Sequence, residues 1–345
     1  MTVRTMLKIP VLSIVLTLLL AATPIFAAPP SGKNDTLPSG KRVLIISIDG
    51  MRPDVLLRAK APNIRELTTH GSFTFWAEST DLAITLPTHV SMLTGVSPAK
   101  HRITWNDDRH AGSGVLKVPT IFDLTKKAGY STAMVVGKHK LCIMARPGSV
   151  ECTMASGTTG EDALAISALA SELLRRQQPQ VMFVHFPDPD TAGHASGWGS
   201  PEQVASADRV DQGIGMLMST LRELGLKDKT LIIITADHGG SGRSHGARVP
   251  FSHFIPWIAV GPGVRENYDL TNEPKLAVHV EDVFATALNF LGVPIPAVTD
   301  GKAILSIYGS SFSTFEHPKP TPLSPPLSGG KHLIRGGLEG FAAKE

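Results

Sequence analysis

The chain has 345 residues, of which 42% are hydrophobic and 18% are charged, with a formal net charge of +3. This length and composition suit one large globular domain or two modest ones, and they argue against a low-complexity chain. A net charge so close to zero gives no argument for binding nucleic acid or an anionic membrane surface.

The first 28 residues have the pattern of a secretory signal. Arg4 and Lys8 precede the apolar run VLSIVLTLLLAA, and PIFAA offers cleavage after Ala27 or Ala28. An uncleaved anchor is the alternative, although the apolar run is short for a membrane span. No cysteine lies near the junction, which disfavours a lipoprotein. We therefore expect a secreted or periplasmic protein, with no membrane anchor after signal cleavage.

A polar linker at 29–40 leads into an alternation of strands and helices that fills 41–308. Apolar runs predict strands at 42–48, 72–80, 131–137, 181–186, 230–236 and 256–261. Amphipathic periodicity predicts helices at 61–71, 86–95, 120–130, 161–179, 200–226 and 280–293. This pattern predicts an α/β fold, a mainly parallel sheet sandwiched between helices in a single catalytic domain. Residues 309–345 are rich in Pro and Gly and are expected to be a poorly ordered tail.

Cys142 and Cys152 are the only cysteines, ten residues apart around a Pro-Gly turn. In an oxidising compartment this spacing favours a local disulfide. Two buried free thiols are the alternative, and two cysteines alone are a weak signal for a metal.

Acidic residues follow three of the predicted strands. Asp49 follows 42–48, Asp190 follows 181–186 and Asp237 follows 230–236. Ligands of open α/β sheets bind beyond the carboxyl ends of the strands, so these acids are expected to converge. A single aspartate at a strand end is more often a turn or cap residue, but three such ends make coincidence much less probable.

Histidines accompany two of these acids. His194 comes four residues after Asp190, while His238 directly follows Asp237 and is itself followed by His245. Carboxylate and imidazole ligands indicate zinc, with manganese or iron as alternatives. His253 competes with His245 for the same role. His185 lies inside a predicted strand, so we expect it in the core or in contact with a ligand.

Thr85 immediately precedes the helix predicted at 86–95. Free backbone N–H groups at a helix start favour anionic oxygens, and a hydroxyl beside a metal there could attack phosphorus. On the local pattern alone, a threonine that merely caps the helix is the simpler interpretation.

Five segments in order resemble the alkaline phosphatase superfamily, most closely its nucleotide pyrophosphatase/phosphodiesterase branch: ISIDGMRPD, TLPTHVSMLTGVSPAKHRITWN, PDPDTAGHASG, TADHGGSGRSHG and PWIAVGPGV. The resemblance covers roughly 42–295. It implies a two-zinc centre that activates the attacking oxygen and stabilises the leaving one. It also implies Thr85 as a nucleophile that forms a phospho-threonine, and Asn106 as a donor to a phosphate oxygen. The implied ligands are Asp190, His194 and His245 for one zinc, and Asp49, Asp237, His238 and Thr85 for the other.

Two features depart from that branch. Thr88 stands where the branch usually has Asn before its histidine, so the role of this position is open. Lys138 and Lys140 follow the strand predicted at 131–137, where some members place lysine pairs that contact phosphate oxygens or a substrate carboxylate. Such a pair would favour a phosphate monoester, or a phosphonoacetate hydrolase-like cleavage of a C–P bond, over a diester. Two solvated surface lysines are the simpler alternative.

Other functions fit less well. Sulfatases share the fold, but Thr85 and His89 break their Cys/Ser-x-Pro-x-Arg pattern. Lipid head-group transferases usually carry several membrane spans. A metal-binding protein without catalysis remains a distant alternative. The sequence thus predicts a hydrolase of small phosphate esters, most simply a phosphodiesterase or nucleotide pyrophosphatase, rather than a protein that binds nucleic-acid polymers.

Overall fold

The computed structural model describes residues 40–110, 114–155 and 162–309. The predicted leader, all but the end of the predicted linker and nearly all of the predicted tail lie outside the described residues. Within the described ranges, no helix is long and apolar enough to cross a membrane.

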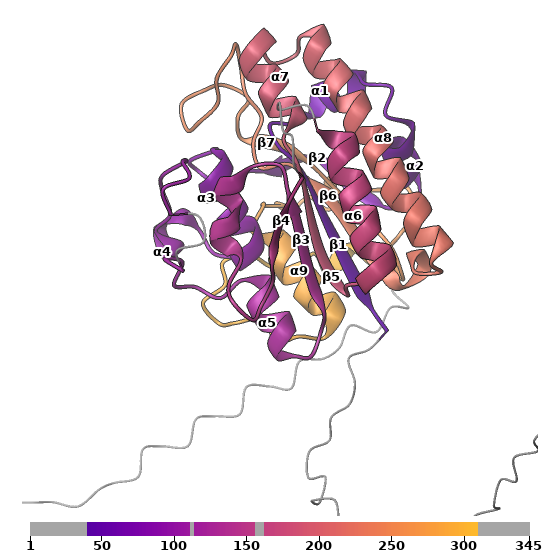
Figure 1. Ribbon diagram of the computed structural model, residues 1–345. Coiled ribbons are helices and arrows are strands. Elements are labelled where there is room, and N and C mark those ends of the chain that lie inside the picture. Colours follow the sequence, from indigo (N-terminus) through magenta and orange to yellow (C-terminus); the bar gives the residue numbers. More distant parts are fainter. Residues whose placement is uncertain (1–39, 111–113, 156–161, 310–345) are drawn as a thin grey trace, which may run out of the picture. The chain divides into compact units, whose positions relative to one another are not determined.

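A mixed sheet forms the middle layer of the described part (Figure 1). Its strands are β1 (Arg42–Ile48), β2 (Ser72–Glu78), β3 (Thr132–Val136), β4 (Cys152–Met154), β5 (Val181–Phe186), β6 (Thr230–Thr235), β7 (Phe254–Val260) and β8 (Tyr268–Asp269). They lie in the order β4-β3-β5-β1-β6-β7-β2-β8, and β7 alone among these strands runs antiparallel to its neighbours. The predicted α/β fold with a mainly parallel sheet is confirmed.

Helices cover both faces of this sheet (Figure 1). One face carries α1 (Pro53–Arg58), α2 (Pro62–Thr69), α6 (Ala163–Gln177), α7 (Asp188–Ser196) and α8 (Pro201–Glu223). The other carries α3 (Thr85–Thr94), α4 (Pro98–His101), α5 (Ile121–Lys127) and α9 (Asp282–Leu291). Short 3-10 turns lie at His139–Met144, Lys227–Lys229, Leu270–Asn272 and Leu305–Ile307.

The three central strands are buried on both faces because helices cover them on each side. β1, β5 and β6 are continuous runs of mostly β-branched and aromatic residues, as expected for strands inside a parallel sheet. Ser47 of β1 is in register with His185 of β5 and Thr235 of β6. The three strands therefore end at the same edge, and the residues that follow them leave the sheet close together.

The predicted disulfide is confirmed, since Cys142 and Cys152 are bonded. Cys142 lies in the 3-10 turn that follows β3, and Cys152 begins β4. The bridge therefore ties the turn that carries Lys140 to the edge of the sheet.

Candidate metal centre and active site

The aspartates at the ends of β1, β5 and β6 lie in one cluster, as the strand order requires. Asp49 directly follows β1, Asp190 lies in the first turn of α7, and Asp237 comes two residues after β6. All three residues are at most 4% exposed. Burying three carboxylates together costs free energy unless positive charges compensate them, so we expect cations to bind at this cluster.

The more accessible part of the cluster, which we call the open group, consists of Asp190, His194 and His245. The sequence pattern did not predict α7, yet this helix puts Asp190 and His194 on one face, four residues apart. Oδ1 of Asp190 lies 3.4 Å from Nε2 of His194 and 3.7 Å from Nε2 of His245. The side chain of His194 is 45% exposed, so this group borders solvent.

The inner part, which we call the buried group, consists of Asp49, Asp237 and His238, none of which is exposed. Nε2 of His238 lies 3.5 Å from Oδ1 of Asp49 and 3.2 Å from Oδ2 of Asp237. Oδ1 of Asp190 lies 4.0 Å from the same nitrogen, so the two groups adjoin. Ligand atoms of Asp49, Asp190 and His238 all lie within 4.8 Å of one another, so the set that could share one cation here includes Asp190 in place of Asp237.

Backbone carbonyl groups fix the tautomer of each histidine in the two groups. A carbonyl oxygen can only accept, so each Nδ1 donates, and each ring presents the lone pair of Nε2 when it is neutral. The contacts are His194 to Arg243 O at 3.0 Å, His238 to Gly239 O at 2.9 Å and His245 to Ala83 O at 3.1 Å. The Nε2 atoms of His194 and His245 then face each other at 3.1 Å, an arrangement that a metal ion between them would satisfy.

Unpaired carboxylate oxygens point to the same conclusion. Oδ1 of Asp49, Oδ1 of Asp190 and Oδ2 of Asp237 are buried and make no hydrogen bond. Burial, and then the charge of Asp49, raise the pKa of Asp237 well above its ordinary value. All three oxygens could coordinate a divalent cation, and mixed nitrogen and oxygen ligands suit zinc, manganese or iron. The residues present therefore fit a centre of two metal ions, although nothing in the donor set selects one element.

His253 does not join either group. Its Nε2 lies 3.2 Å from the carbonyl oxygen of Ala247, whereas His245 lies within 3.7 Å of Asp190. Of the two rivals, the structure brings His245 to the cluster.

Thr85 lies at the edge of the buried group. It is the first residue of α3, follows the extended Ile84 and is 1% exposed. Its Oγ1 lies 3.4 Å from Nε2 of His238. Oδ1 of Asn106 accepts a hydrogen bond of 2.9 Å from Leu86 N, which leaves the amide NH2 of Asn106 as its donor. The hydroxyl group and the backbone N–H of Thr85, at the start of α3, thus lie beside the acids, an arrangement suited to an anionic substrate.

The two lysines have different neighbours. Nζ of Lys138 lies 2.7 Å from Oδ2 of Asp49 and 2.6 Å from Oδ2 of Asp190. Burial opposes its charge, but these carboxylates prevail and raise the pKa of Lys138. Nζ of Lys140 donates to the backbone oxygen of Asn106 at 2.9 Å, and burial followed by the charge of Lys138 lowers the pKa of Lys140. Neither is a freely solvated surface lysine.

His185 contacts the buried group from the core, as expected from its place in a strand. Its Nδ1 accepts from Gly137 N at 3.2 Å, so Nε2 carries the proton and donates to Oδ2 of Asp49 at 3.0 Å. Burial lowers the pKa of His185, which keeps the ring neutral. Outer-shell contacts of this kind orient a ligand carboxylate.

His89 was not singled out from the sequence as a site residue, but it lies behind Thr85. Its Nδ1 donates to the carbonyl oxygen of Thr85 at 2.7 Å, and its Nε2 accepts from the hydroxyl group of Ser47 at 2.8 Å. The only sequence signal is its position four residues after Thr85, one helical turn away. Next to it, the hydroxyl group of Thr88 lies 2.8 Å from that of Thr80. This buried hydrogen bond holds the start of α3 against the segment that follows β2.

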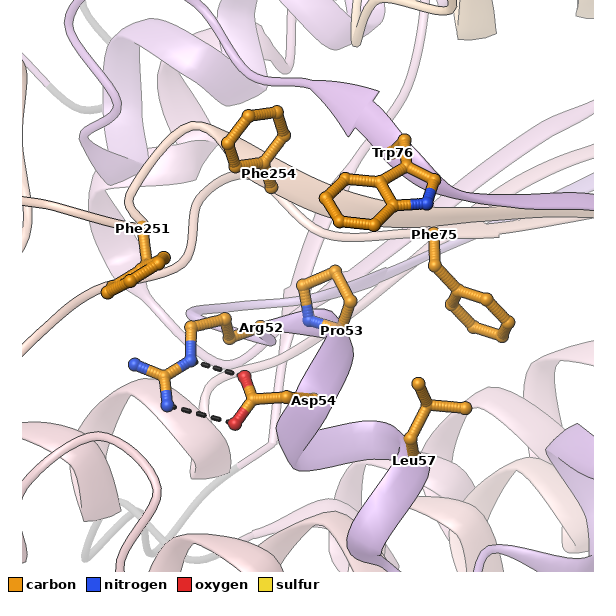
Figure 2. Close-up of a pocket in the computed structure, with 8 residues that line it drawn as sticks. All are labelled: Arg52, Pro53, Asp54, Leu57, Phe75, Trp76, Phe251 and Phe254. Carbon is orange, nitrogen blue, oxygen red and sulfur yellow. Dashed lines mark hydrogen bonds and ion pairs between the residues drawn. The ribbon is translucent and has the colours of Figure 1, made fainter. Parts of the chain in front are cut away.

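An aromatic pocket of about 520 Å³ lies between α1, β2 and the segment before β7 (Figure 2). Phe75, Trp76 and Phe254 form much of its wall, and Phe251 lies near the guanidinium group of Arg52. That group is already paired with Asp54 and donates to Gly240 O at 2.8 Å. Among the described residues that line the pocket, the cation Arg52 is thus already paired, so the pocket offers mainly apolar surface.

Much of the chain is similar to known proteins. Residues 43–256 match the family described as type I phosphodiesterase / nucleotide pyrophosphatase. The chain is 27% identical over 266 residues to bis(5'-adenosyl)-triphosphatase enpp4 of Xenopus laevis, covering 71% of this chain and 56% of that protein. It is 29% identical over 213 residues to human ectonucleotide pyrophosphatase/phosphodiesterase family member 1, covering 57% of this chain and 23% of that protein. The chain thus spans about half the length of the first relative and about a quarter of the second.

Solved structures show the same fold. Murine ectonucleotide pyrophosphatase/phosphodiesterase 5 in complex with AMP matches with a TM-score of 0.62 at 16% identity, covering 78% of this chain and 100% of that one. The phosphonate monoester hydrolase of Agrobacterium radiobacter matches with a TM-score of 0.59 at 16% identity, covering 78% and 77%. The match over 43–256, which is more than half of the chain, shows that the chain belongs to the type I phosphodiesterase / nucleotide pyrophosphatase family.

Proposed function

We propose that the protein is an exported, metal-dependent phosphoric ester hydrolase that uses Thr85 as its nucleophile and acts on phosphodiesters or nucleotide pyrophosphates. The observation that carries this proposal is the position of the Thr85 hydroxyl group, 3.4 Å from Nε2 of His238, beside three buried carboxylates with unpaired oxygens. Family membership, and relatives named as pyrophosphatases and phosphodiesterases, support the reaction class.

Two zinc ions are the proposed cofactor, with manganese or iron as alternatives. The open group would hold one ion, and the buried group would hold the other together with Thr85. When bound, the ions would supply charge stabilisation to the attacking and leaving oxygens.

Thr85 would carry out the covalent step. Its hydroxyl oxygen loses its proton and forms a bond to phosphorus, while the bond from phosphorus to the ester oxygen breaks. This gives a phospho-threonine, and the departing oxygen takes up a proton and leaves as part of an alcohol or a nucleotide. Water then attacks the same phosphorus and releases the phosphate product and Thr85. The NH2 of Asn106 and the backbone N–H of Thr85 would donate to the non-bridging oxygens as their charge grows.

Hydrolysis of a monoester or of a phosphonate is the second candidate, and Lys138 is the observation that favours it. An ammonium group has three N–H donors, and two of those of Lys138 point to Asp49 and Asp190. The third remains for a phosphate dianion or a substrate carboxylate, with Lys140 close by at Asn106.

The assigned nucleophile can be tested with Thr85→Ala and Thr85→Ser. We expect purified Thr85→Ala to keep its metal ions and lose turnover, and Thr85→Ser to keep part of it. Wild-type turnover by Thr85→Ala with verified metal content would contradict the assignment. Rates on bis(4-nitrophenyl) phosphate, 4-nitrophenyl phosphate, a dinucleotide and phosphonoacetate would then rank the substrate classes, and a monoester preference that collapses in Lys138→Ala would favour the second candidate.

Export is the proposed setting of this activity. The pattern of the first 28 residues indicates it, and a disulfide between Cys142 and Cys152 is typical of an oxidising compartment. Fractionation of expressing cells should recover the protein outside the cytoplasm, and recovery of full-length protein in the cytosol would contradict this setting.

A further inference from the structure

Lys138 is a nearly buried cation placed between the two groups of proposed metal ligands. Its side chain is 18% exposed. Close packing of the strand ends brings it there, since a side chain at the preceding Gly137 would collide with Pro187, which begins the segment after β5. A lysine at the end of β3 thereby reaches acids that follow β1 and β5.

This lysine contacts one oxygen of each of two carboxylates. Nζ lies 2.7 Å from Oδ2 of Asp49 and 2.6 Å from Oδ2 of Asp190, and His185 also donates to the first of these oxygens. The Oδ1 atoms of both aspartates are left buried and unpaired. Each carboxylate therefore turns a single oxygen toward the histidines proposed as metal ligands.

We propose that Lys138 is a resident counter-ion of the metal centre, which holds Asp49 and Asp190 together in the metal-free protein and weakens the binding of divalent cations beside it. The inference rests on the proposed metal ligands. It assigns Lys138 a role before any substrate arrives, which is compatible with its third N–H serving a substrate afterwards.

Two consequences follow from elementary electrostatics. Without the lysine, Asp49 and Asp190 would repel each other inside the protein, so the metal-free form should be less stable. The site would also be more negative by one charge, so divalent cations should bind more tightly, by roughly tenfold or more.

Lys138→Met tests both consequences, because methionine keeps an unbranched chain but removes the charge. Lys140→Met is the matched control. It removes the same charge two residues away, from a lysine that donates to Asn106 and not to the two aspartates. Lys138→Arg keeps the charge and serves if the methionine variant does not fold without metal. Zinc affinity is measured by competition with a chromophoric chelator, and the melting temperature is measured in excess EDTA.

We expect Lys138→Met to bind zinc at least about tenfold more tightly than wild type and to melt at a lower temperature without metal. Lys140→Met should change both quantities less, and Lys138→Arg should stay near wild type. The inference would be overturned if Lys138→Met bound zinc no more tightly than wild type. It would also be overturned if Lys140→Met changed zinc affinity and melting temperature as much as Lys138→Met, or if Lys138→Arg changed them as Lys138→Met does. Failure of the wild-type protein to bind zinc, manganese or iron would instead refute the proposed metal centre.

Discussion

The buried group and the open group use similar side chains in different surroundings. Asp49, Asp237 and His238 are fully buried, whereas the side chain of His194 is 45% exposed. Additional contacts hold the buried group in place. Gly50 N donates to Asp237 at 3.0 Å, and Oδ2 of Asp49 has two donors of its own.

This difference separates two roles at one centre. The buried group lies next to Thr85 and is held by the core of the sheet, so it suits the fixed geometry that nucleophilic attack requires. Two members of the open group, Asp190 and His194, lie on the short helix α7, and His194 borders solvent, so this group suits exchange of ligands and products. Four experiments would break or sharpen this comparison.

The largest expected effect is a difference in kcat/KM between His238→Ala and His194→Ala. Loss of His238 removes a ligand beside Thr85, so kcat/KM should fall by more than the roughly 100-fold that loss of an outer-shell partner costs. Loss of His194 should leave more activity, and added zinc should restore part of it. Steady-state kinetics with measured metal content decide between them, and equal losses would remove the distinction between the groups.

Chelation should remove metal in two steps. Because the open group is accessible, its ion should leave first when the protein is mixed with a chromophoric chelator, and the ion of the buried group should follow more slowly. His194→Ala should lack the fast phase. A single phase that His194→Ala leaves unchanged would show that accessibility does not set the order of release.

A smaller effect is expected from His185→Ala, which removes the imidazole donor to Asp49 without removing a proposed ligand. Metal affinity or kcat/KM should fall by about 10- to 100-fold, and the slow phase of chelation should become faster. An effect confined to the fast phase would mean that His185 does not support the buried group.

Asp188→Asn should have the smallest effect on activity and a measurable effect on stability. Asp188 precedes Asp190 by two residues but accepts from Ala163 N, away from the ligands, and burial raises its pKa to about 6. The folded protein therefore holds this proton more tightly than the unfolded chain, and the ionised group costs stability as the pH rises from about 4 to about 6. The variant should raise the free energy of unfolding at neutral pH by about 1–3 kcal/mol and change it little below about pH 4. Chemical denaturation at two pH values measures this, with Asp190→Asn as the contrast that should lose metal.

Much of the fold could be predicted from the sequence because its strongest signals are local. The apolar runs of β1, β5 and β6 need burial on both faces, which only a covered parallel sheet provides. The convergence of Asp49, Asp190 and Asp237 followed from their places at the ends of those strands. The helical form of α7 was missed because its segment contains Pro and Gly and its acids suggested a loop.

The contacts around the site could not be predicted, because they join elements far apart in the chain. Nothing near Lys138 in the sequence indicates that its ammonium group meets Asp49 and Asp190. His89 gave only the spacing of one helical turn, and its bond to Ser47 depends on the packing of α3 on β1. The aromatic pocket likewise exists only because β2 and the segment before β7 adjoin α1.

The central claim is that a phosphoryl group passes through Thr85 before it reaches water. The most direct test is the stereochemistry at phosphorus, measured by hydrolysis of a chiral phosphorothioate diester in oxygen-18 water. Two successive displacements, first by Thr85 and then by water, predict net retention of configuration. Net inversion would show that water attacks the substrate directly and would contradict the account.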